Sequence, residues 1–312
     1  MSRAIVFPGQ GSQAVGMGRE LAEAFPIARQ VFEEVDEALK QKLSQIMWEG
    51  PADDLTLTEN AQPALMAVSL AVIRVLEQQG GWKLAEQAAF VAGHSLGEYS
   101  ALAAAGTFTL ADTARLLKVR GQAMQKAVPV GQGAMAALLG AEFEQAKEIA
   151  ALAAQGDVCE AANDNASGQV VISGSKAAID RAIAIAAEKG LKRAMLLPVS
   201  APFHCALMQP AADAMAEALA GVEMNNPVVP VVANVLASAV QDAAEIRKLL
   251  VAQVTGTVRW RESVLYMKSQ GVDNLVETGA GKVLAGLVKR IDKEVSAISL
   301  NTPADIEAFL KG

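Results

Sequence analysis

The chain has 312 residues, of which 52% are hydrophobic, and its 27 basic and 34 acidic side chains give a formal net charge of −7 at pH 7. This length and apolar content can fill the core of one large α/β domain or of two unequal domains, which excludes a short binding module and a disordered chain. The negative charge is the wrong sign for a broad face that binds phosphate backbones, so we expect no nucleic-acid partner.

Membrane attachment and metal binding are also disfavoured. The first apolar run, residues 4–7, is too short for a secretory signal, and no uninterrupted apolar stretch approaches the ~18 residues that span a bilayer. We therefore expect a cytoplasmic protein without a membrane anchor. Two cysteines cannot build a disulfide framework, and two histidines leave no zinc site of the usual spacing, so no metal is expected.

The first part of the chain alternates short apolar segments with longer helical patterns. The pattern predicts a strand at 4–7, helices at 17–40 and 64–79, a strand at 88–92 that leads into a helix, and a helix at 110–127. This alternation is typical of an α/β fold with a parallel sheet and crossover helices.

The rhythm changes near residue 134. Strands are predicted at 134–139, 158–162, 169–173 and 193–198, with helices at 143–154 and 177–189, in the order β-α-β-β-α-β of a ferredoxin-like unit. Later strands at 228–233, 274–277 and 296–300 are separated by helices. We expect a small ferredoxin-like domain, residues 128–197, inserted into a large α/β-hydrolase-like domain made of residues 1–127 and 198–312.

A serine stands in a motif typical of acyl-transfer enzymes. Gly93-His94-Ser95-Leu96-Gly97 fits G-x-S-x-G, with a predicted strand before it and a helix after it. A sharp turn between strand and helix exposes the serine hydroxyl, and flanking glycines avoid a Cβ clash. Ser95 is therefore a candidate nucleophile. The alternative is a glycine-bounded turn in which Ser95 only caps the helix.

A serine nucleophile needs a base, and the chain offers only two imidazoles. His94 is adjacent to Ser95, and adjacent side chains diverge on a sharp turn. His204 lies in a proline-bounded loop at the start of a predicted helix, where catalytic groups are common. If Ser95 has a histidine base, that base is His204. The alternative is a helix-start histidine bonded to backbone.

The helix predicted at 110–127 directs one arginine inward. Arg120 follows the apolar stripe of Leu116, Leu117 and Met124 at helical spacing. A buried guanidinium requires an anion. Two partners are open: an internal Asp or Glu, or the carboxylate of a substrate.

The N-terminal glycines allow two interpretations. Gly9-x-Gly11-x-x-Ala14 is a loose match to the dinucleotide-binding fingerprint. A glycine-rich loop at the end of a strand can equally present backbone N–H groups to an oxyanion beside Ser95.

Together these segments resemble a known family. The carrying residues, in chain order, are Phe7-Pro8-Gly9-Gln10-Gly11-Ser12-Gln13, Gln62-Pro63-Ala64-Leu65, Gly93-His94-Ser95-Leu96-Gly97-Glu98-Tyr99, Arg120-Gly121, Gln169-Val170-Val171-Ile172-Ser173-Gly174 and Pro202-Phe203-His204. Over nearly the whole chain the sequence is similar to the malonyl-CoA:acyl carrier protein transacylase family of type II fatty acid synthesis.

The resemblance implies a ping-pong acyl transfer. Ser95 attacks the malonyl thioester of malonyl-CoA with His204 as base, and the phosphopantetheine thiol of acyl carrier protein then takes the malonyl group. No cofactor is implied beyond the groups that the two substrates carry, and we expect a monomer.

The resemblance also implies roles for further residues. The main-chain carbonyl of Gln253 orients His204, and the backbone N–H groups of Gln10 and Leu96 hold the oxyanion. Arg120, Gln62 and Asn165 bind the substrate, with Arg120 clamping the malonyl carboxylate. The loop after Asn165 departs from the family, whose members usually carry Ser-Pro there, whereas this chain has Ala166-Ser167.

Two other functions remain open from the residues themselves. A serine esterase or thioesterase would use the same nucleophile and base. A nucleotide-binding protein would use the N-terminal glycines.

Overall fold

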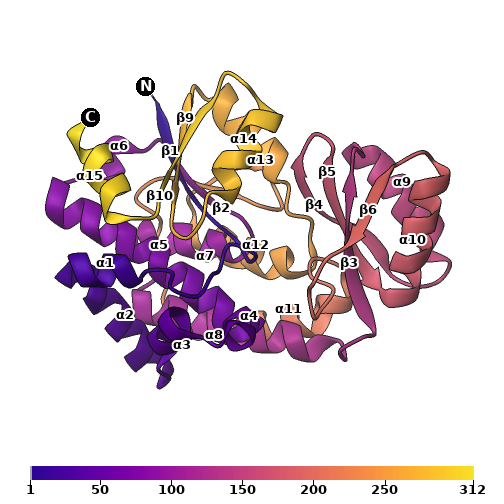
Figure 1. The fold of residues 1–312 in the computed structure, drawn as a ribbon, viewed down its shortest axis with the longest axis horizontal. Helices are drawn as coiled ribbons and strands as arrows, with labels where there is room; N and C mark the ends of the chain where they lie inside the picture. Colours follow the sequence, from indigo (N-terminus) through magenta and orange to yellow (C-terminus); the bar gives the residue numbers. More distant parts are fainter. Residues whose placement is uncertain (1) are drawn as a thin grey trace.

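The computed structural model describes residues 2–312, which form two separate β-sheets covered by helices (Figure 1). One sheet has six strands and the other has four. The protein is thus a mixed α/β structure, as the sequence predicts.

The six-stranded sheet is drawn from both ends of the chain. Its strands, in spatial order, are β10 (Ser296–Leu300), β9 (Asn274–Thr278), β1 (Arg3–Phe7), β2 (Phe90–Gly93), β7 (Val231–Ala233) and β8 (Ser238–Val240). All neighbours are parallel except β8, which returns antiparallel to β7 and was not expected. The three central strands β1, β2 and β7 therefore end at the same edge of the sheet.

Helices bury both faces of this sheet. Side chains alternate along β1, so that Ile5 and Phe7 face one apolar core and Ala4 and Val6 face the other. The first core contains α1 (Arg19–Ala24), α2 (Pro26–Leu39), α3 (Leu43–Glu49), α4 (Ala52–Thr56), α5 (Thr58–Gly80), α6 (Leu84–Gln87), α7 (Leu96–Ala104), α8 (Leu110–Ala127), α11 (Gln209–Ala220), α12 (Ala243–Thr255) and α15 (Pro303–Lys311). The second core contains α13 (Trp260–Ser269) and α14 (Val283–Ile291).

Proline explains two differences from the predicted helices. The helix expected at 17–40 is two helices, because Phe25 is extended (φ −129°, ψ 115°), as a residue before proline prefers, and α2 begins at Pro26. The helix expected to start at 64 begins six residues earlier, with Pro63 inside it. Pro63 lies within the first two turns of α5. Because proline has no N–H, the helix loses only the hydrogen bond that residue 63 would donate to the carbonyl of Glu59.

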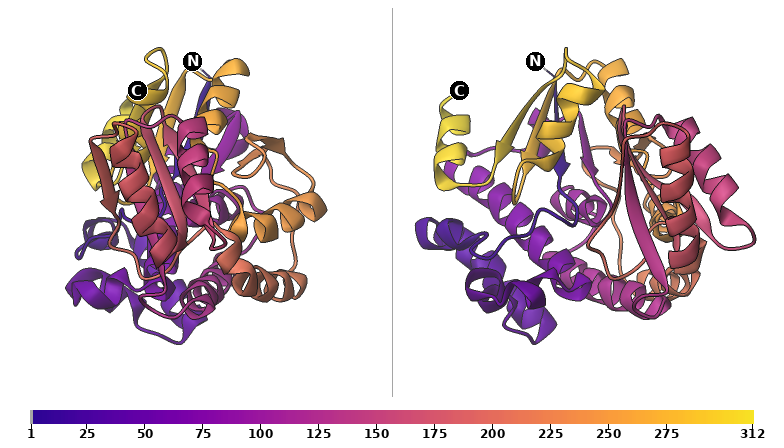
Figure 2. Two further views of the ribbon diagram at one scale, coloured as in Figure 1. Left: turned by 90° about the vertical axis from the view of Figure 1, so that its right-hand side faces the viewer. Right: turned by 45° about the vertical axis from the view of Figure 1, so that its right-hand side comes forward.

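The four-stranded sheet is antiparallel. It has the order β4 (Cys159–Ala166), β5 (Gln169–Ser175), β3 (Gly133–Leu139) and β6 (Arg193–Leu196). Helices α9 (Phe143–Ala154) and α10 (Lys176–Glu188) cover its outer face, away from the six-stranded sheet (Figure 2). Alternation along β3 sends Ala136 and Leu138 toward these helices and Met135 toward the large core.

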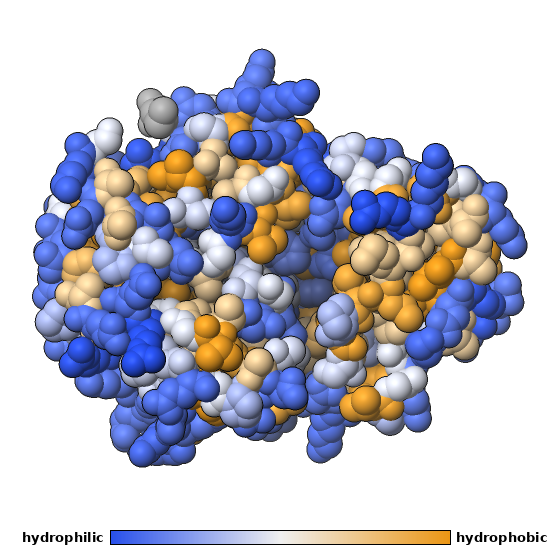
Figure 3. Space-filling model, viewed as in Figure 1, coloured by the Kyte–Doolittle hydropathy of each residue, from blue (hydrophilic) through white to orange (hydrophobic). Residues whose placement is uncertain are grey.

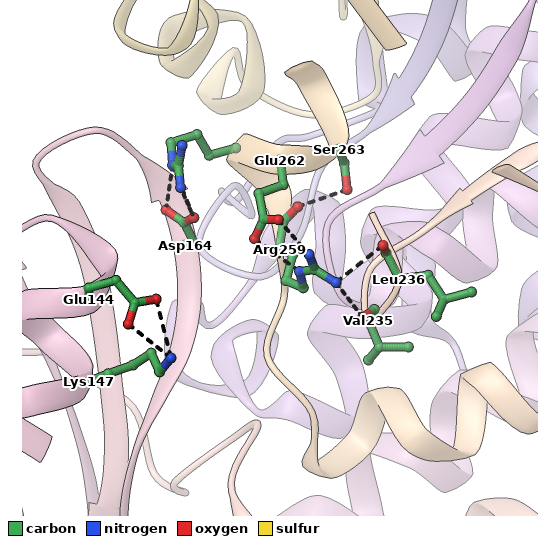
Figure 4. Close-up of polar contacts among 9 residues, drawn as sticks. Glu144, Lys147, Asp164, Val235, Leu236, Arg259, Glu262 and Ser263 are labelled. Atoms are coloured by element: carbon green, nitrogen blue, oxygen red, sulfur yellow. Dashed lines mark hydrogen bonds and ion pairs between the residues drawn. The ribbon is translucent and has the colours of Figure 1, made fainter. Parts of the chain in front are cut away.

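Strand β4 ties the small sheet to the rest of the molecule. The backbone of Val258 donates to Ala162 O (2.9 Å) and accepts from Asp164 N (2.9 Å). Next to this pairing, the buried carboxylate of Asp164 accepts from Arg261 Nε at 3.1 and 3.0 Å (Figure 4). The small sheet is therefore joined by backbone and by charge to the segment that leads into α13.

No helix within residues 2–312 has the length and apolar character that a bilayer crossing demands. The cellular location of the protein stays a prediction.

We expect Asp164→Ala to lower the free energy of unfolding by about 2–4 kcal/mol, because it leaves Arg261 without its buried partner. Chemical denaturation monitored by circular dichroism measures the change. The control is Asp180→Ala, which breaks an exposed pair with Lys176 and should change stability by less than about 0.5 kcal/mol. Equal effects of the two substitutions would contradict the anchoring role of Asp164.

Candidate active site

The loops that follow three neighbouring parallel strands converge at one edge of the large sheet. Gln10 lies in the loop after β1, Ser95 follows β2, and Asn234 follows β7. The carboxyl ends of parallel strands are where open α/β sheets bind ligands. The candidate site lies at this edge.

The turn around Ser95 has the strained backbone that the motif predicts. Ser95 has φ 53° and ψ −111°, a conformation that costs a residue with a side chain about 1–3 kcal/mol. A Cβ on Gly93 would lie 1.9 Å from Gly97 O, and one on Gly97 would lie 2.2 Å from Phe7 O. Both glycines are therefore required for strand β2 to turn directly into α7.

The hydroxyl of Ser95 meets His204, although 109 residues separate them in the chain. Ser95 Oγ lies 2.8 Å from His204 Nε2 and makes no capping bond to the helix, so the interpretation of Ser95 as a simple helix cap is wrong. His204 Nδ1 lies 2.9 Å from Gln253 O and 3.2 Å from Gly256 O. Carbonyl oxygens only accept, so Nδ1 carries the proton and Nε2 is free to accept from Ser95.

The surroundings keep His204 neutral. Burial, followed by the nearby charge of Arg120, lowers the pKa of His204 to about 3. The imidazole is only 4% exposed. At neutral pH its Nε2 lone pair is therefore available as a base.

Arg120 is fully buried, with 1% exposure, yet its hydrogen-bond partners are all neutral. Nη1 donates to Gln62 Oε1 (2.8 Å), and Nη2 donates to Gln253 Oε1 (2.8 Å) and Ser95 Oγ (3.0 Å). Nε has no partner in the described part of the chain. The alternative of an internal ion pair with Asp or Glu is not realised within residues 2–312.

A cavity of about 440 Å³ opens over these groups, in the hollow between the two sheets (Figure 3). Six of the predicted site residues line it: Gln10, Gln62, Ser95, Leu96, Arg120 and His204. Apolar walls come from Met124, Met135, Leu197, Val199 and Phe203. Because Gln10 and Gly11 line the same cavity as Ser95, the N-terminal glycine loop belongs to this site.

The side chain of Asn165 contacts His94 and does not line the cavity. It is absent from the cavity lining, whereas Asn163 is present. The Oδ1 of Asn165 instead accepts a hydrogen bond from His94 Nε2 at 2.8 Å. The substrate contact of Asn165 stays a prediction, and Asn163 is the asparagine that lines the cavity. His94 contacts Asn165 rather than the hydroxyl of Ser95.

Two buried polar residues of the site were missed in the sequence analysis. Asn234 Oδ1 accepts from Ser95 N (2.8 Å), and Glu98 Oε2 accepts from Asn234 N (2.8 Å) and Gln253 Nε2 (3.2 Å). Burial raises the pKa of Glu98 to about 7. A polar residue directly after the predicted strand at 228–233 is the signal that could have indicated Asn234.

No group of three or more His, Cys, Asp and Glu side chains in residues 2–312 is placed to hold a metal ion. The functional groups of the site are a hydroxyl, an imidazole, a guanidinium and side-chain amides.

The chain is similar to known proteins over nearly its whole length. The family model of the acyl transferase domain matches residues 4–302. The malonyl CoA-acyl carrier protein transacylase of Escherichia coli (strain K12) is 48% identical over 308 residues, 99% of this chain and 98% of that protein.

Solved structures give the same result. An acyl-carrier-protein-S-malonyltransferase from Bartonella henselae is 57% identical, with a TM-score of 0.97 and coverage of 100% of this chain and 99% of that one. A malonyl-transacylase in complex with its type II PKS acyl-carrier protein is 44% identical, with a TM-score of 0.96 and coverage of 100% and 99%. The chain therefore belongs to the acyl transferase domain family and, within it, to the malonyl CoA-acyl carrier protein transacylases.

Proposed function

We propose that this chain moves a malonyl group from malonyl-CoA to the phosphopantetheine thiol of an acyl carrier protein through an ester on Ser95. One observation carries the proposal: Ser95 Oγ lies 2.8 Å from a neutral imidazole and 3.0 Å from a buried guanidinium that forms no ion pair within residues 2–312. A nucleophile, its base and a receptor for a carboxylate thus meet at one point.

Acylation begins when Ser95 Oγ attacks the thioester carbonyl carbon and passes its proton to His204 Nε2. The tetrahedral intermediate collapses with cleavage of the C–S bond. His204 returns the proton to the CoA sulfur, which leaves as a thiol. The carbonyl oxygens of Gln253 and Gly256 accept hydrogen bonds from the Nδ1–H of His204, so they also stabilise the imidazolium that forms between these steps.

Deacylation repeats the chemistry in reverse. The carrier thiol gives its proton to His204 and attacks the ester carbon, the C–O bond to Ser95 breaks, and Ser95 Oγ takes the proton back. One binding site therefore serves the acyl donor and the acyl acceptor in turn, which is a ping-pong mechanism.

The oxyanion of each intermediate needs two donors. Leu96 is the first residue of α7, so its backbone N–H has no partner within the helix. Gln10 follows β1 and lines the same cavity, and its side-chain Nε2 donates to Thr58 Oγ1 at 3.0 Å. We assign the oxyanion to the backbone N–H groups of Leu96 and Gln10.

The carboxylate of the malonyl group would take the place of the missing anion on Arg120. Nη1 makes one hydrogen bond among residues 2–312, to Gln62, so its second N–H is the donor that we assign to the carboxylate. Gln62 fixes the guanidinium through Nη1 from the side of α5. Asn163 lines the cavity and offers a further polar contact, beside the predicted contact of Asn165.

The finer description of the fold belongs to the same proposal. The strand order β4-β5-β3-β6 and the antiparallel pairing support a ferredoxin-like domain over residues 128–197. The turn from β2 through Ser95 into α7 supports a hydrolase-like domain from residues 1–127 and 198–312. All proposed catalytic groups come from one chain, so a monomer suffices for the reaction.

The direct test is the mass of the intact protein after mixing with malonyl-CoA. We expect the wild type to gain one malonyl group and Ser95→Ala to gain none, because the ester forms on the Ser95 oxygen. Ser100→Ala, a buried serine of the same helix, is the control and should be labelled normally.

Adding a thiol acceptor should then discharge the labelled enzyme much faster than buffer alone. Loss of the label at the same rate with and without thiol would identify a thioesterase and overturn the transfer reaction.

Arg120→Ala should weaken malonyl transfer by about 2–5 kcal/mol in kcat/KM and should affect acetyl transfer much less, because only malonyl carries a free carboxylate. Competition between the two acyl-CoA donors measures the ratio. Arg115→Ala removes an exposed arginine from the same helix and should leave the ratio unchanged. Equal losses for both donors in Arg120→Ala would show that the residue is structural.

The depressed pKa of His204 predicts that acylation persists in acid. An ordinary imidazole with a pKa near 6.5 would lose activity about 30-fold at pH 5, whereas His204, with a pKa of about 3, stays neutral there. Single-turnover acylation between pH 5 and 8 measures this.

Two controls interpret the pH profile. Glu98→Gln removes the group whose pKa is about 7, so an acid limb that survives this change and titrates near 6.5 would contradict a neutral His204.

The free energy of unfolding has to be measured over the same pH range. The unfolded state binds a proton at His204 below about 6.5 and the folded state only near 3, so this residue lowers stability as the pH falls between these values.

A further inference from the structure

The geometry points to Asn234 as the positioning residue that holds the turn around Ser95 in its reactive shape. This inference rests on the proposed function, since it concerns how Ser95 is presented to the thioester. No substrate contact is assigned to Asn234, which does not line the cavity.

One amide bridges both sides of the turn. Asn234 Oδ1 accepts from Ser95 N at 2.8 Å, and Asn234 Nδ2 donates to Gly93 O at 2.7 Å. An N–H group can only donate and a carbonyl can only accept, so these two partners fix the orientation of the amide. The side chain of Asn234 thus links Gly93 and Ser95, the two residues on either side of His94 in the turn.

The backbone groups that it binds have lost their regular partners. Gly93 is the last residue of β2, and Ser95 precedes the first residue of α7 with φ 53°. Buried polar groups of the backbone need a partner, and a strained conformation persists only where its surroundings over-determine it. Asn234 supplies both a donor and an acceptor at the point of strain.

Asn234 is itself held from two sides. Its N–H donates to Glu98 Oε2 at 2.8 Å, and its carbonyl accepts from Arg259 N at 3.1 Å. The guanidinium of Arg259 then donates to the carbonyls of Val235 (3.3 Å) and Leu236 (3.2 Å), the two residues that follow Asn234 (Figure 4). The side chain is 1% exposed, so it has little freedom to move.

The same carboxylate connects the nucleophile to the base. Glu98 Oε2 also accepts from Gln253 Nε2 at 3.2 Å, and the carbonyl of Gln253 holds His204 Nδ1. Asn234 fixes Ser95, and Gln253 fixes His204, against one shared group. Loss of the Asn234 side chain should therefore displace Ser95 Oγ from His204 Nε2 and from Arg120 Nη2, while Arg120 Nη1 keeps its bond to Gln62.

The test is the rate of Ser95 acylation in Asn234→Ala. We expect the single-turnover rate with malonyl-CoA to fall about 10- to 100-fold and the KM for malonyl-CoA to stay within about twofold, because positioning acts on the chemical step. Labelling by a fluorophosphonate, which needs a reactive serine but no malonyl pocket, should fall in parallel. Asn234→Asp keeps an acceptor for Ser95 N and should recover part of the rate. If the alanine variant does not fold, Asn234→Asp provides the test in its place.

Asn274→Ala is the matched control. Asn274 is a 5% exposed amide in the same sheet that also bridges two partners, Arg3 and Ser296, but it lies at the opposite edge from the site. It should lower the melting temperature and leave the rate per folded molecule unchanged.

Wild-type rates in both Asn234 variants, or losses that match Asn274→Ala once the folded fraction is measured, would overturn the inference. A raised KM with an unchanged acylation rate would also overturn it. The proposed function fails separately: the wild type would then not be acylated by malonyl-CoA, and fluorophosphonate labelling would still decide whether Asn234 controls Ser95.

Discussion

A positive charge buried among neutral partners is the constraint around which the site is organised. Removing an ion from water without a counter-ion costs several kcal/mol, and Arg120 recovers part of this from amide oxygens and from the face of Tyr99, whose ring centre lies 5.6 Å from the guanidinium carbon. The same charge helps to lower the pKa of His204. Under the proposed function, an incoming carboxylate neutralises Arg120 and removes this second contribution, whereas the larger contribution, the burial of His204, stays.

Backbone strain at two positions makes this meeting of groups possible. Ser95 and His204 both have positive φ, at 53° and 57°. Neither is a glycine, so each must be held by its surroundings. Ser95 is held by Asn234, and the imidazole of His204 by the carbonyls of Gln253 and Gly256. The reacting atoms thus lie on strained loops whose partners belong to buried elements, and their 2.8 Å separation is set before substrate arrives.

How much of this is predictable depends on the kind of signal. Ser95 could be found because its glycines are a local steric requirement, and Arg120 because helical periodicity places it inward. Gln253 could not be found from composition or spacing, because its proposed role uses a carbonyl that every residue has. The different surroundings of Asn163, which lines the cavity, and Asn165, which contacts His94, could not be predicted for another reason: the pairing of β4 with β5 shifts register between Asp164 and Ala166, and such a bulge redirects side chains that simple alternation would place together.

The same strand limits how the small sheet can move. The backbone of Val258 pairs with β4, while Gly256 O lies 3.2 Å from His204 Nδ1 and Arg259 N donates to Asn234 O. A displacement of β4 would therefore pull on the segment that supports both the base and the nucleophile turn. At the opposite edge of the small sheet, β6 is largely exposed, and the residues after it, Leu197 and Val199, line the cavity. The small sheet thus supports the reacting groups through β4 at one edge and supplies apolar cavity wall after β6 at the other.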